Sequence, residues 1–397
     1  MRRLSFGMFL LLLLLSNTSV AQSDSIYRGT RDINDYLRQL FSKKHKTDSV
    51  EVDNKKVAFS LLPAPVDANA NTGLVVSFVS SFNLGEEGTD TKMSQVNFAP
   101  SFSFANQYVF PIKSYIYTNE DKYSFIGDYR FMIYPQPTYG LGTHNLAEEM
   151  SVLNYKQWRF YQFVTRKVSE QLRVGGGVLI DNYQNILEES EVDYPTDFDL
   201  YMKGNYSDVH SFGLAVQLLS DTRTNTINPE QGHYIELDYR FNFNGGVDNQ
   251  SWQSVYIDLR KYHSFSPVRH QILAYRAFYW FTLNGDPHYL DLPSIGWDRD
   301  QRTGRGFTRN RYRSNSLLYF EGEYRTDLTR NGFLGAVFFS NLSTVSTLHK
   351  YNFPKWVPAV GTGLRLKWNK RNNANLALDF GVSKYDWSLR LGLTENF

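Results

Sequence analysis

Apolar and polar residues alternate along most of the chain, beginning near Val57. Successive side chains of a β-strand point to opposite faces, so this alternation predicts strands with one apolar and one polar face. The segment 234–243 shows the pattern clearly. Its apolar positions are Ile235, Leu237, Tyr239, Phe241 and Phe243, and its polar positions are Glu236, Asp238, Arg240 and Asn242. The same pattern recurs in 255–260, 318–328 and 387–394.

Sixteen segments are predicted to be strands: 57–65, 73–84, 94–105, 107–119, 123–135, 154–168, 171–186, 207–222, 232–244, 251–264, 270–284, 316–329, 333–345, 358–369, 374–384 and 386–397. A soluble β-sandwich also alternates, but strands of about 10–15 residues are long for a sandwich and match the ~9–11 tilted residues that cross a membrane. The four longest connections all follow odd-numbered strands; they are 136–153, 187–206, 285–315 and 346–357. These features predict an all-β fold, a 16-stranded antiparallel transmembrane β-barrel with both termini in the periplasm and long loops at the cell surface.

Composition agrees with a membrane barrel. Aromatic residues make up 16% of the chain, yet the mean hydropathy is −0.43, and no apolar run after the N-terminus is long enough for a membrane helix. There are no cysteines, so no disulfide framework is expected. The net charge of +2 gives no reason to expect a nucleic-acid partner.

Three regions are predicted. Residues 1–21 read as a signal peptide, with Arg2 and Arg3 before a short apolar run and a small-residue cleavage site at Ala21. Residues 22–56 form a short periplasmic segment that is either one amphipathic helical stretch or disordered. Residues 57–397 form the barrel. Pro63 and Pro65 remove two backbone donors from the first strand, so its pairing with the last strand should be incomplete near its outer end. The alternative is that 57–65 is only an extended lead-in.

Several ordered motifs resemble those of the BamA/TamA superfamily of outer-membrane assembly and translocation barrels, here in a short form without periplasmic repeat domains. A D-x-R…P-x-x-G turn is matched by Asp221, Arg223, Pro229 and Gly232. The R-G-F/Y motif of the sixth surface loop is matched by Arg305, Gly306 and Phe307, between the predicted eleventh and twelfth strands. Segments 321–325, 361–365 and 378–381 resemble the strands that follow that loop. The resemblance covers Val57 to Phe397.

The resemblance implies that loop 285–315 folds into the lumen and that Arg305 is locked there by acidic side chains. Glu321 and Glu323 lie on the polar face of the next strand and are the expected partners. Asn341 occupies a position where the superfamily has an aspartate, so the lock could rest on Glu323, with Glu321 in reserve. The alternative is that the loop is basic and solvated. For the remaining loop arginines we expect contact with solvent or with phosphates; these are Arg299, Arg302, Arg309, Arg311 and Arg313.

The chain ends at Phe397, and the stretch from Gly392 resembles the terminal signal of outer-membrane barrels. No catalytic motif was found, so we expect no enzyme activity, cofactor or metal. The first hypothesis is a monomeric barrel of the bacterial outer membrane that helps to insert or transport proteins or lipid through a weak seam between the first and last strands. Its partners would be outer-membrane lipid and client proteins. The alternative is a passive pore or a structural barrel that anchors a separate periplasmic or lipoprotein partner.

Overall fold

A computed structural model of the chain describes residues 29–33, 35–36, 39, 58–63, 66–67, 72–86, 89, 91–103, 107–143, 147–266, 270–370 and 373–397. The predicted signal peptide and Pro65 lie outside these residues. No helix in the described part of the chain is long and apolar enough to cross a membrane.

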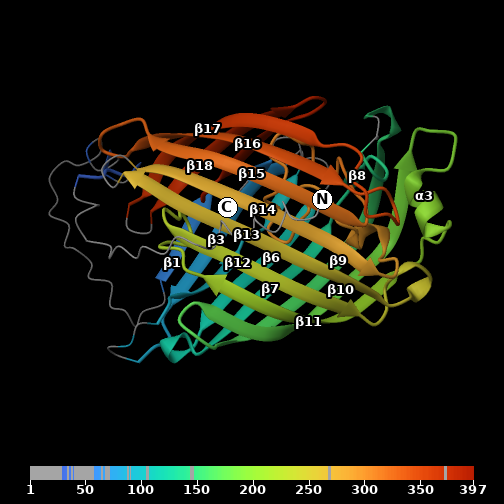
Figure 1. The fold of residues 1–397 in the computed structure, drawn as a ribbon, viewed down its shortest axis with the longest axis horizontal. Coiled ribbons are helices and arrows are strands. Elements are labelled where there is room, and N and C mark those ends of the chain that lie inside the picture. Colours follow the sequence, from blue (N-terminus) through green and yellow to red (C-terminus); the bar gives the residue numbers. More distant parts are fainter. Residues whose placement is uncertain are drawn as a thin grey trace, which may run out of the picture.

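The described strands form one antiparallel sheet (Figure 1). Its strands are β1 (Ala58–Pro63), β2 (Val66–Asp67), β3 (Thr72–Phe82), β4 (Ser94–Phe98), β5 (Ser101–Ser103), β6 (Tyr108–Tyr117), β7 (Tyr123–Ile133), β8 (Gln136–Thr138), β9 (Ser151–Lys167), β10 (Leu172–Ser190), β11 (Val209–Asp221), β12 (Gly232–Asn242), β13 (Trp252–Ser266), β14 (Gln271–Asn284), β15 (Ser316–Asp327), β16 (Leu334–Val345), β17 (Val357–Asn369), β18 (Ala374–Ser383) and β19 (Trp387–Gly392). From β9 onward each strand pairs with the next, and β19 pairs with β2.

Short helices occupy several connections: η2 (Asn119–Asp121), η3 (Ala147–Glu149), α3 (Asp197–Met202), η4 (Val247–Asn249) and η5 (Tyr289–Asp291). Thr196 begins α3 with a capping box, in which its side chain accepts from the Asp199 amide and the Asp199 carboxylate accepts from the Thr196 amide. This helix lies in the connection between β10 and β11, at one end of the molecule (Figure 1).

Prolines divide the early strands. β1 and β2 are separated after Pro63, β4 and β5 at Pro100, and β7 and β8 at Pro135. A proline cannot donate to the ladder, so the hydrogen-bonded pairing is interrupted where it occurs. The strands after β8 run unbroken over 10 to 19 residues, except β19, which has six.

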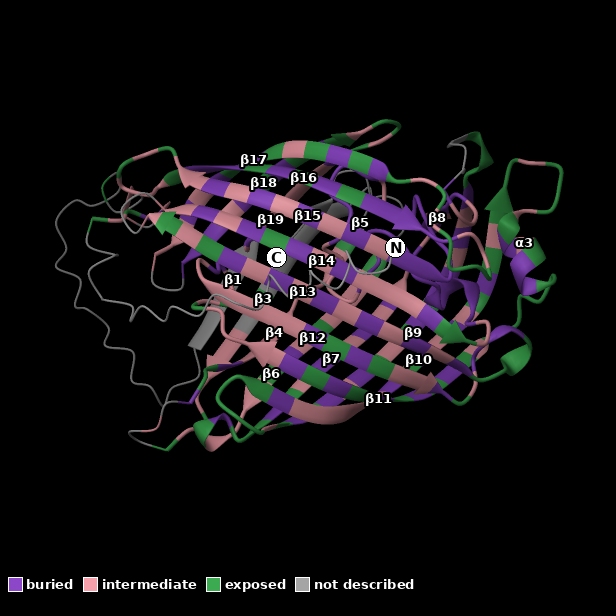
Figure 2. Cartoon of the chain, viewed as in Figure 1, coloured by how far each residue is buried: buried purple, intermediate pink, exposed green. Residues whose placement is uncertain are grey.

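The sheet is polar on its inner face and apolar on its outer face. Glu236 and Asp238 of β12 are buried, whereas their neighbours Leu237 and Tyr239 are exposed. Figure 2 shows the same alternation of buried and exposed residues along the front strands. A soluble protein buries its apolar face, so this inverted arrangement is that of a sheet whose outer surface meets lipid.

The N-terminal segment contacts the turns that follow β15 and β17. The Arg31 amide donates to the Asn331 carbonyl at 3.1 Å, and Lys370 Nζ lies 2.7 Å from Asp35 Oδ2. The ring of Tyr36 packs on Phe333 with centroids 4.3 Å apart. The described part of this segment is therefore held against the rim of the sheet, in agreement with the helical alternative at residues 33, 35–36 and 39.

Candidate functional site

Loop 285–315 lies inside the curved sheet. Lys113 of β6 binds Asp300 at 2.8 Å, and Arg130 of β7 donates to the Arg299 carbonyl at 2.6 Å. On another side, Arg305 contacts β15 and β18. One segment that touches strands so far apart in the sheet must be surrounded by them. The loop residues from His288 to Trp297 are buried accordingly.

Arg305 is held by three carboxylates. Its Nε donates to Glu321 Oε1 at 2.7 Å, its Nη2 contacts both Glu321 and Glu323, and its Nη1 lies 3.0 Å from Asp379 Oδ2. We call Arg305, Glu321, Glu323 and Asp379 the Arg305 cluster. Although burial alone would lower it, these carboxylates raise the pKa of Arg305 well above its ordinary value.

The geometry around Arg305 explains why glycines flank it. Gly304 and Gly306 have φ of +77° and +90°, and a Cβ on Gly306 would lie 2.8 Å from Ala359 Cβ. The Gly306 amide donates to Ser388 Oγ at 2.7 Å. Only glycine combines this backbone conformation with such a close approach to the wall.

One aromatic ring covers the Arg305 guanidinium. The Phe339 ring lies 3.7 Å from the Arg305 guanidinium carbon. Phe307 instead packs on Tyr312 within a separate buried group. Asn341 donates from Nδ2 to the Arg305 carbonyl at 2.8 Å. Asp379 supplies a third carboxylate, and Glu321 binds Arg305 directly, so the expectation that the lock rests on Glu323 with Glu321 in reserve is wrong. The sequence motif alone does not identify Asp379 as a partner of Arg305, although its exposed apolar neighbours Leu378 and Phe380 place it on the inner face.

The expectation that the remaining loop arginines are solvated or face phosphates is also wrong for several of them. Arg299 binds Glu236 and Asp238, both at 2.5 Å, and its side chain is only 20% exposed. Arg311 and Arg313 are buried, and Arg313 donates to the Tyr289 carbonyl at 2.6 Å. The carboxylates and carbonyls that satisfy these guanidiniums come from distant strands or from the loop itself, so local sequence gives no sign of them.

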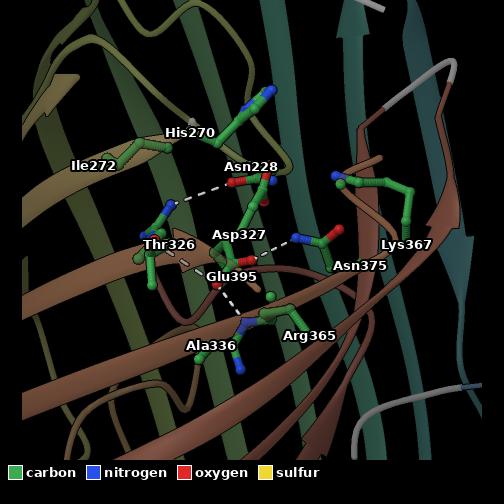
Figure 3. Close-up of a pocket in the computed structure, with 13 residues that line it drawn as sticks. Asn228, His270, Ile272, Thr326, Asp327, Ala336, Arg365, Lys367, Asn375 and Glu395 are labelled. Atoms are coloured by element: carbon green, nitrogen blue, oxygen red, sulfur yellow. Dashed lines mark hydrogen bonds and ion pairs between the residues drawn. The ribbon is translucent and has the colours of Figure 1, made fainter. Parts of the chain in front are cut away.

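The last residues do not continue the final strand. β19 ends at Gly392, so the predicted strand 386–397 is too long by five residues. Glu395 turns inward, where Arg365 Nε donates to it at 2.7 Å and Asn375 Nδ2 at 2.9 Å (Figure 3). Phe397 is buried against Tyr262 and Ala274.

Arginines of the loop and wall hold this C-terminal tail, residues 393–397. Arg302 Nη1 donates to the Glu395 carbonyl at 3.3 Å, and Arg325 Nη2 donates to the Phe397 carbonyl at 2.9 Å. Arg365 also lies 2.6 Å from Asp379 Oδ1, which links the tail to the Arg305 cluster. Glu395 is therefore a buried partner of two wall residues.

The D-x-R turn forms at one end of β11. Asp221 accepts two hydrogen bonds of 2.8 Å from Arg223, whose guanidinium lies over the Tyr234 ring. Gly232 has φ +101°, and a Cβ there would collide with the Thr222 carbonyl. The Pro229 carbonyl accepts from Arg325 at 3.1 Å. The structure therefore connects this turn to the tail through Arg325.

The described pairing between the two ends of the sheet is short. β19 pairs with β2 through Arg390↔Asp67 and Leu391↔Val66. β1 pairs with β3, with Pro63 opposite Val76, and no other partner of β1 is found among the described residues. We expected incomplete pairing of segment 57–65 with the last strand near its outer end. Among the described residues β1 makes no pair with β19, because β19 stops at Gly392 and the tail turns inward.

No group of three or more metal-ligating side chains is found in the described ranges. His288 is buried, and its pKa is lowered to about 3 by burial and by Arg313, so it is neutral at physiological pH.

Comparison with solved structures identifies the fold. A crystal structure of BamA from Haemophilus ducreyi lacking POTRA domains 1-3 matches 95% of this chain and 82% of that one, with a TM-score of 0.55 and 12% identity. CdiB from Escherichia coli matches 85% of this chain and 67% of its own, with a TM-score of 0.52 and 11% identity. CdiB from Acinetobacter baumannii matches 85% of this chain and 64% of its own, with a TM-score of 0.50 and 12% identity.

No protein-family model and no curated protein matches the chain in sequence. The fold is that of a transmembrane β-barrel. More narrowly, it is the barrel fold of BamA and CdiB, which is found in bacterial outer-membrane proteins.

Proposed function

We propose that the chain is a 16-stranded barrel of the bacterial outer membrane that assists the insertion or transport of proteins, or of lipid, through the seam between its first and last strands. The likeness in fold to BamA and CdiB supports this proposal. In this arrangement both termini lie in the periplasm, loop 285–315 enters the lumen from the cell surface, and the barrel acts as a monomer with outer-membrane lipid and client proteins as partners.

The observation that carries the proposal is the short described pairing of β19 with β2, next to an edge of β1 for which the described residues supply no partner. Unpaired backbone groups are costly in lipid, where no water can satisfy them. Such an edge is also a template on which another strand can pair. A client strand would gain backbone hydrogen bonds at this edge while it enters the membrane.

The tail and the Arg305 cluster support the rest of the barrel during such an event. The tail residues 393–397 are bound to Arg302, Arg325 and Arg365, which belong to the loop and to β15 and β17. β19 is also tied to the loop, because Arg390 Nη2 donates to the Gly304 carbonyl at 2.9 Å. The loop and the wall therefore hold the last strand from inside, whereas the edge that faces it belongs to the first strand.

A disulfide across the seam tests the proposal. The pair Val66→Cys and Leu391→Cys would join opposite residues of β2 and β19, and the chain has no other cysteine. The matched control, Leu378→Cys with Leu391→Cys, joins β18 to β19 and uses the same position on the last strand. Growth and outer-membrane protein levels would be measured in the source bacterium with and without reductant.

We expect the seam disulfide to abolish function under oxidising conditions and reductant to restore it, while the control remains active. Full function with the seam completely cross-linked would reject the proposed mechanism. Equal loss in both cysteine pairs would mean that mobility of β19 as a whole, and not opening of the seam, is required.

The second candidate is a passive pore or a structural anchor for a separate periplasmic or lipoprotein partner. The contact of Asp35 and Tyr36 with Lys370 and Phe333 favours the anchor, because it shows that the rim can hold a peptide segment. Planar bilayer recordings before and after deletion of loop 285–315 test the pore: conductance that appears on deletion supports it, and no conductance in either form rejects it.

A further inference from the structure

The connection between β11 and β12 leaves its own strands and reaches the C-terminal side of the sheet. We call residues 222–231 the β11–β12 turn. Its Glu230 Oε1 accepts from Asn373 Nδ2 at 3.0 Å, and Asn373 lies between β17 and β18. Five strand spacings separate β12 from β17, or about 24 Å along the sheet at ~4.8 Å per spacing. The turn must therefore extend across the end of the curved sheet to make this contact.

The β11–β12 turn is fixed at its base and holds its own shape. Gly232, just after it, has φ +101°, and a Cβ there would lie 2.2 Å from the Thr222 carbonyl oxygen. The Asn225 side chain accepts from the amides of Ile227 and Asn228, at 2.7 and 2.9 Å. Because these hydrogen bonds lie within the turn, a rotation at its base would move the turn as one unit.

At its far end the turn is held by polar contacts. Glu230 Oε1 also lies 3.4 Å from Nδ1 of His270, just before β14. Arg325 of β15 donates from Nη1 to the Pro229 carbonyl at 3.1 Å and from Nη2 to the Phe397 carbonyl at 2.9 Å. One guanidinium therefore binds both the turn and the C-terminal tail.

The C-terminal tail lies between the loop and this turn. From the loop, Arg302 Nη1 donates to the carbonyls of Glu395 and Asn396, at 3.3 and 3.4 Å. From the turn, the Ile227 carbonyl accepts from the Glu395 amide at 3.3 Å. Glu395 and Phe397 are only 2% and 1% exposed. A tail enclosed on both sides should leave the lumen at this end of the sheet only if the turn moves.

We propose that the β11–β12 turn is a lid that retains the C-terminal tail in the lumen, and that the lid opens before the tail is released. The far end of the lid is held by the hydrogen bonds of Asn228, Pro229 and Glu230, which are few compared with a strand ladder, so it should separate before the wall does. The proposal is independent of the seam mechanism. It concerns the order of two movements, and it would stand if the seam disulfide left function unchanged.

Digestion of the C-terminus tests whether the turn controls the tail. The full chain in micelles would be treated with a carboxypeptidase that removes C-terminal aromatic residues, and mass spectrometry would follow the loss of Phe397. Glu230→Ala removes the contacts with Asn373 and His270 and leaves the tail's own hydrogen bonds in place. We expect this variant to lose Phe397 at least about tenfold faster than the unmodified chain, which corresponds to one hydrogen bond to a charged group. Glu170→Ala is the matched control, because Glu170, in the connection between β9 and β10, also forms an ion pair of 2.9 Å.

Cross-linking supplies the opposite change. Glu230→Cys with Asn373→Cys, joined by a short bismaleimide, would hold the lid shut without the carboxylate, and the chain has no other cysteine. This variant should lose Phe397 quickly before cross-linking and be protected after it, and heat resistance on a gel would check that each variant is folded. Equal digestion rates for Glu230→Ala, Glu170→Ala and the unmodified chain would overturn the proposal. So would rapid loss of Phe397 from the cross-linked form, because the tail would then leave while the lid is shut.

Discussion

The two ends of the sheet meet, yet they are built in opposite ways. On the C-terminal side, β15, β17, β18 and β19 are joined from inside by arginines of the loop and wall. On the N-terminal side, prolines divide the strands into short pieces, and the described pairing to β19 covers two residue pairs. The C-terminal side is joined by buried ion pairs, whereas the described link between the first strands and β19 is a short stretch of backbone pairing.

Under the proposed function, this contrast would let the barrel be rigid on one side and open on the other. A buried ion pair is costly to break once formed, because each partner left behind is an uncompensated charge. A short strand edge is inexpensive to separate, because few hydrogen bonds are lost. Opening should therefore occur beside β1, and the wall around the Arg305 cluster should remain intact.

Removal of the arginine should have the largest effect. Arg305→Ala leaves Glu321, Glu323 and Asp379 buried without their shared partner, and we expect a loss of about 3–5 kcal/mol in the free energy of unfolding. Heat resistance of the folded barrel on a gel and urea unfolding in micelles would measure it. Arg305→Lys keeps the charge but not the planar fork, so its loss should be intermediate. Unchanged heat resistance in the alanine variant would contradict the central role of the cluster.

Hydrogen exchange compares the two regions directly. Amides of β19 that face β2 should exchange at least about 100-fold faster than those between β13 and β14, where the ladder runs from Gln253↔Asn284 to Ser266↔Gln271. Mass spectrometry of the barrel in micelles would measure this. Similar protection at both places would show that the seam is no weaker than the wall.

A pH dependence should follow from Asp291 in the loop. Burial and the charge of Asp181 raise the pKa of the Asp291 carboxyl to about 7. Arg240, the hydrogen bond from the Tyr183 hydroxyl and Arg159 act in the opposite direction. A folded-state pKa above the unfolded value of about 4 means that the stabilising contribution is complete at low pH and is lost as pH rises from 4 to 7.

Asp291→Asn should remove this dependence. Relative to the variant, the unmodified chain should lose stability on the order of 1–3 kcal/mol between pH 4 and 7. Urea unfolding at a series of pH values is the measurement. A constant difference between the two proteins across this range would show that Asp291 does not titrate there.

The rim contact should give the smallest effect. Lys370→Ala removes the partly exposed ion pair with Asp35, which should change stability by less than about 1 kcal/mol. Protease cleavage within the N-terminal segment should nevertheless become faster, because less holds the segment to the rim. Lys384→Ala, in the connection between β18 and β19, serves as the control. Equal cleavage rates in both variants would show that Lys370 does not hold the N-terminal segment to the rim.

The sequence by itself determined the strands and the faces they present. Alternation such as that around Glu236 follows directly from the geometry of a strand, and glycines such as Gly306 and Gly232 indicate turns and close approaches. Most strand positions agree with the structure within a few residues. The R-G-F motif led to Arg305, and the polar face after it led to Glu321 and Glu323.

Only the tertiary structure decided which distant charges meet. Asp379 joins Arg305 across 74 residues of sequence, and Glu395 turns inward to Arg365 where continued alternation predicted a strand. Local patterns report which face a side chain occupies, but the choice of partner depends on how far the sheet curves and on how deeply the loop enters. Buried guanidiniums require carboxylate or carbonyl partners, and that demand exists only once the sheet surrounds the loop.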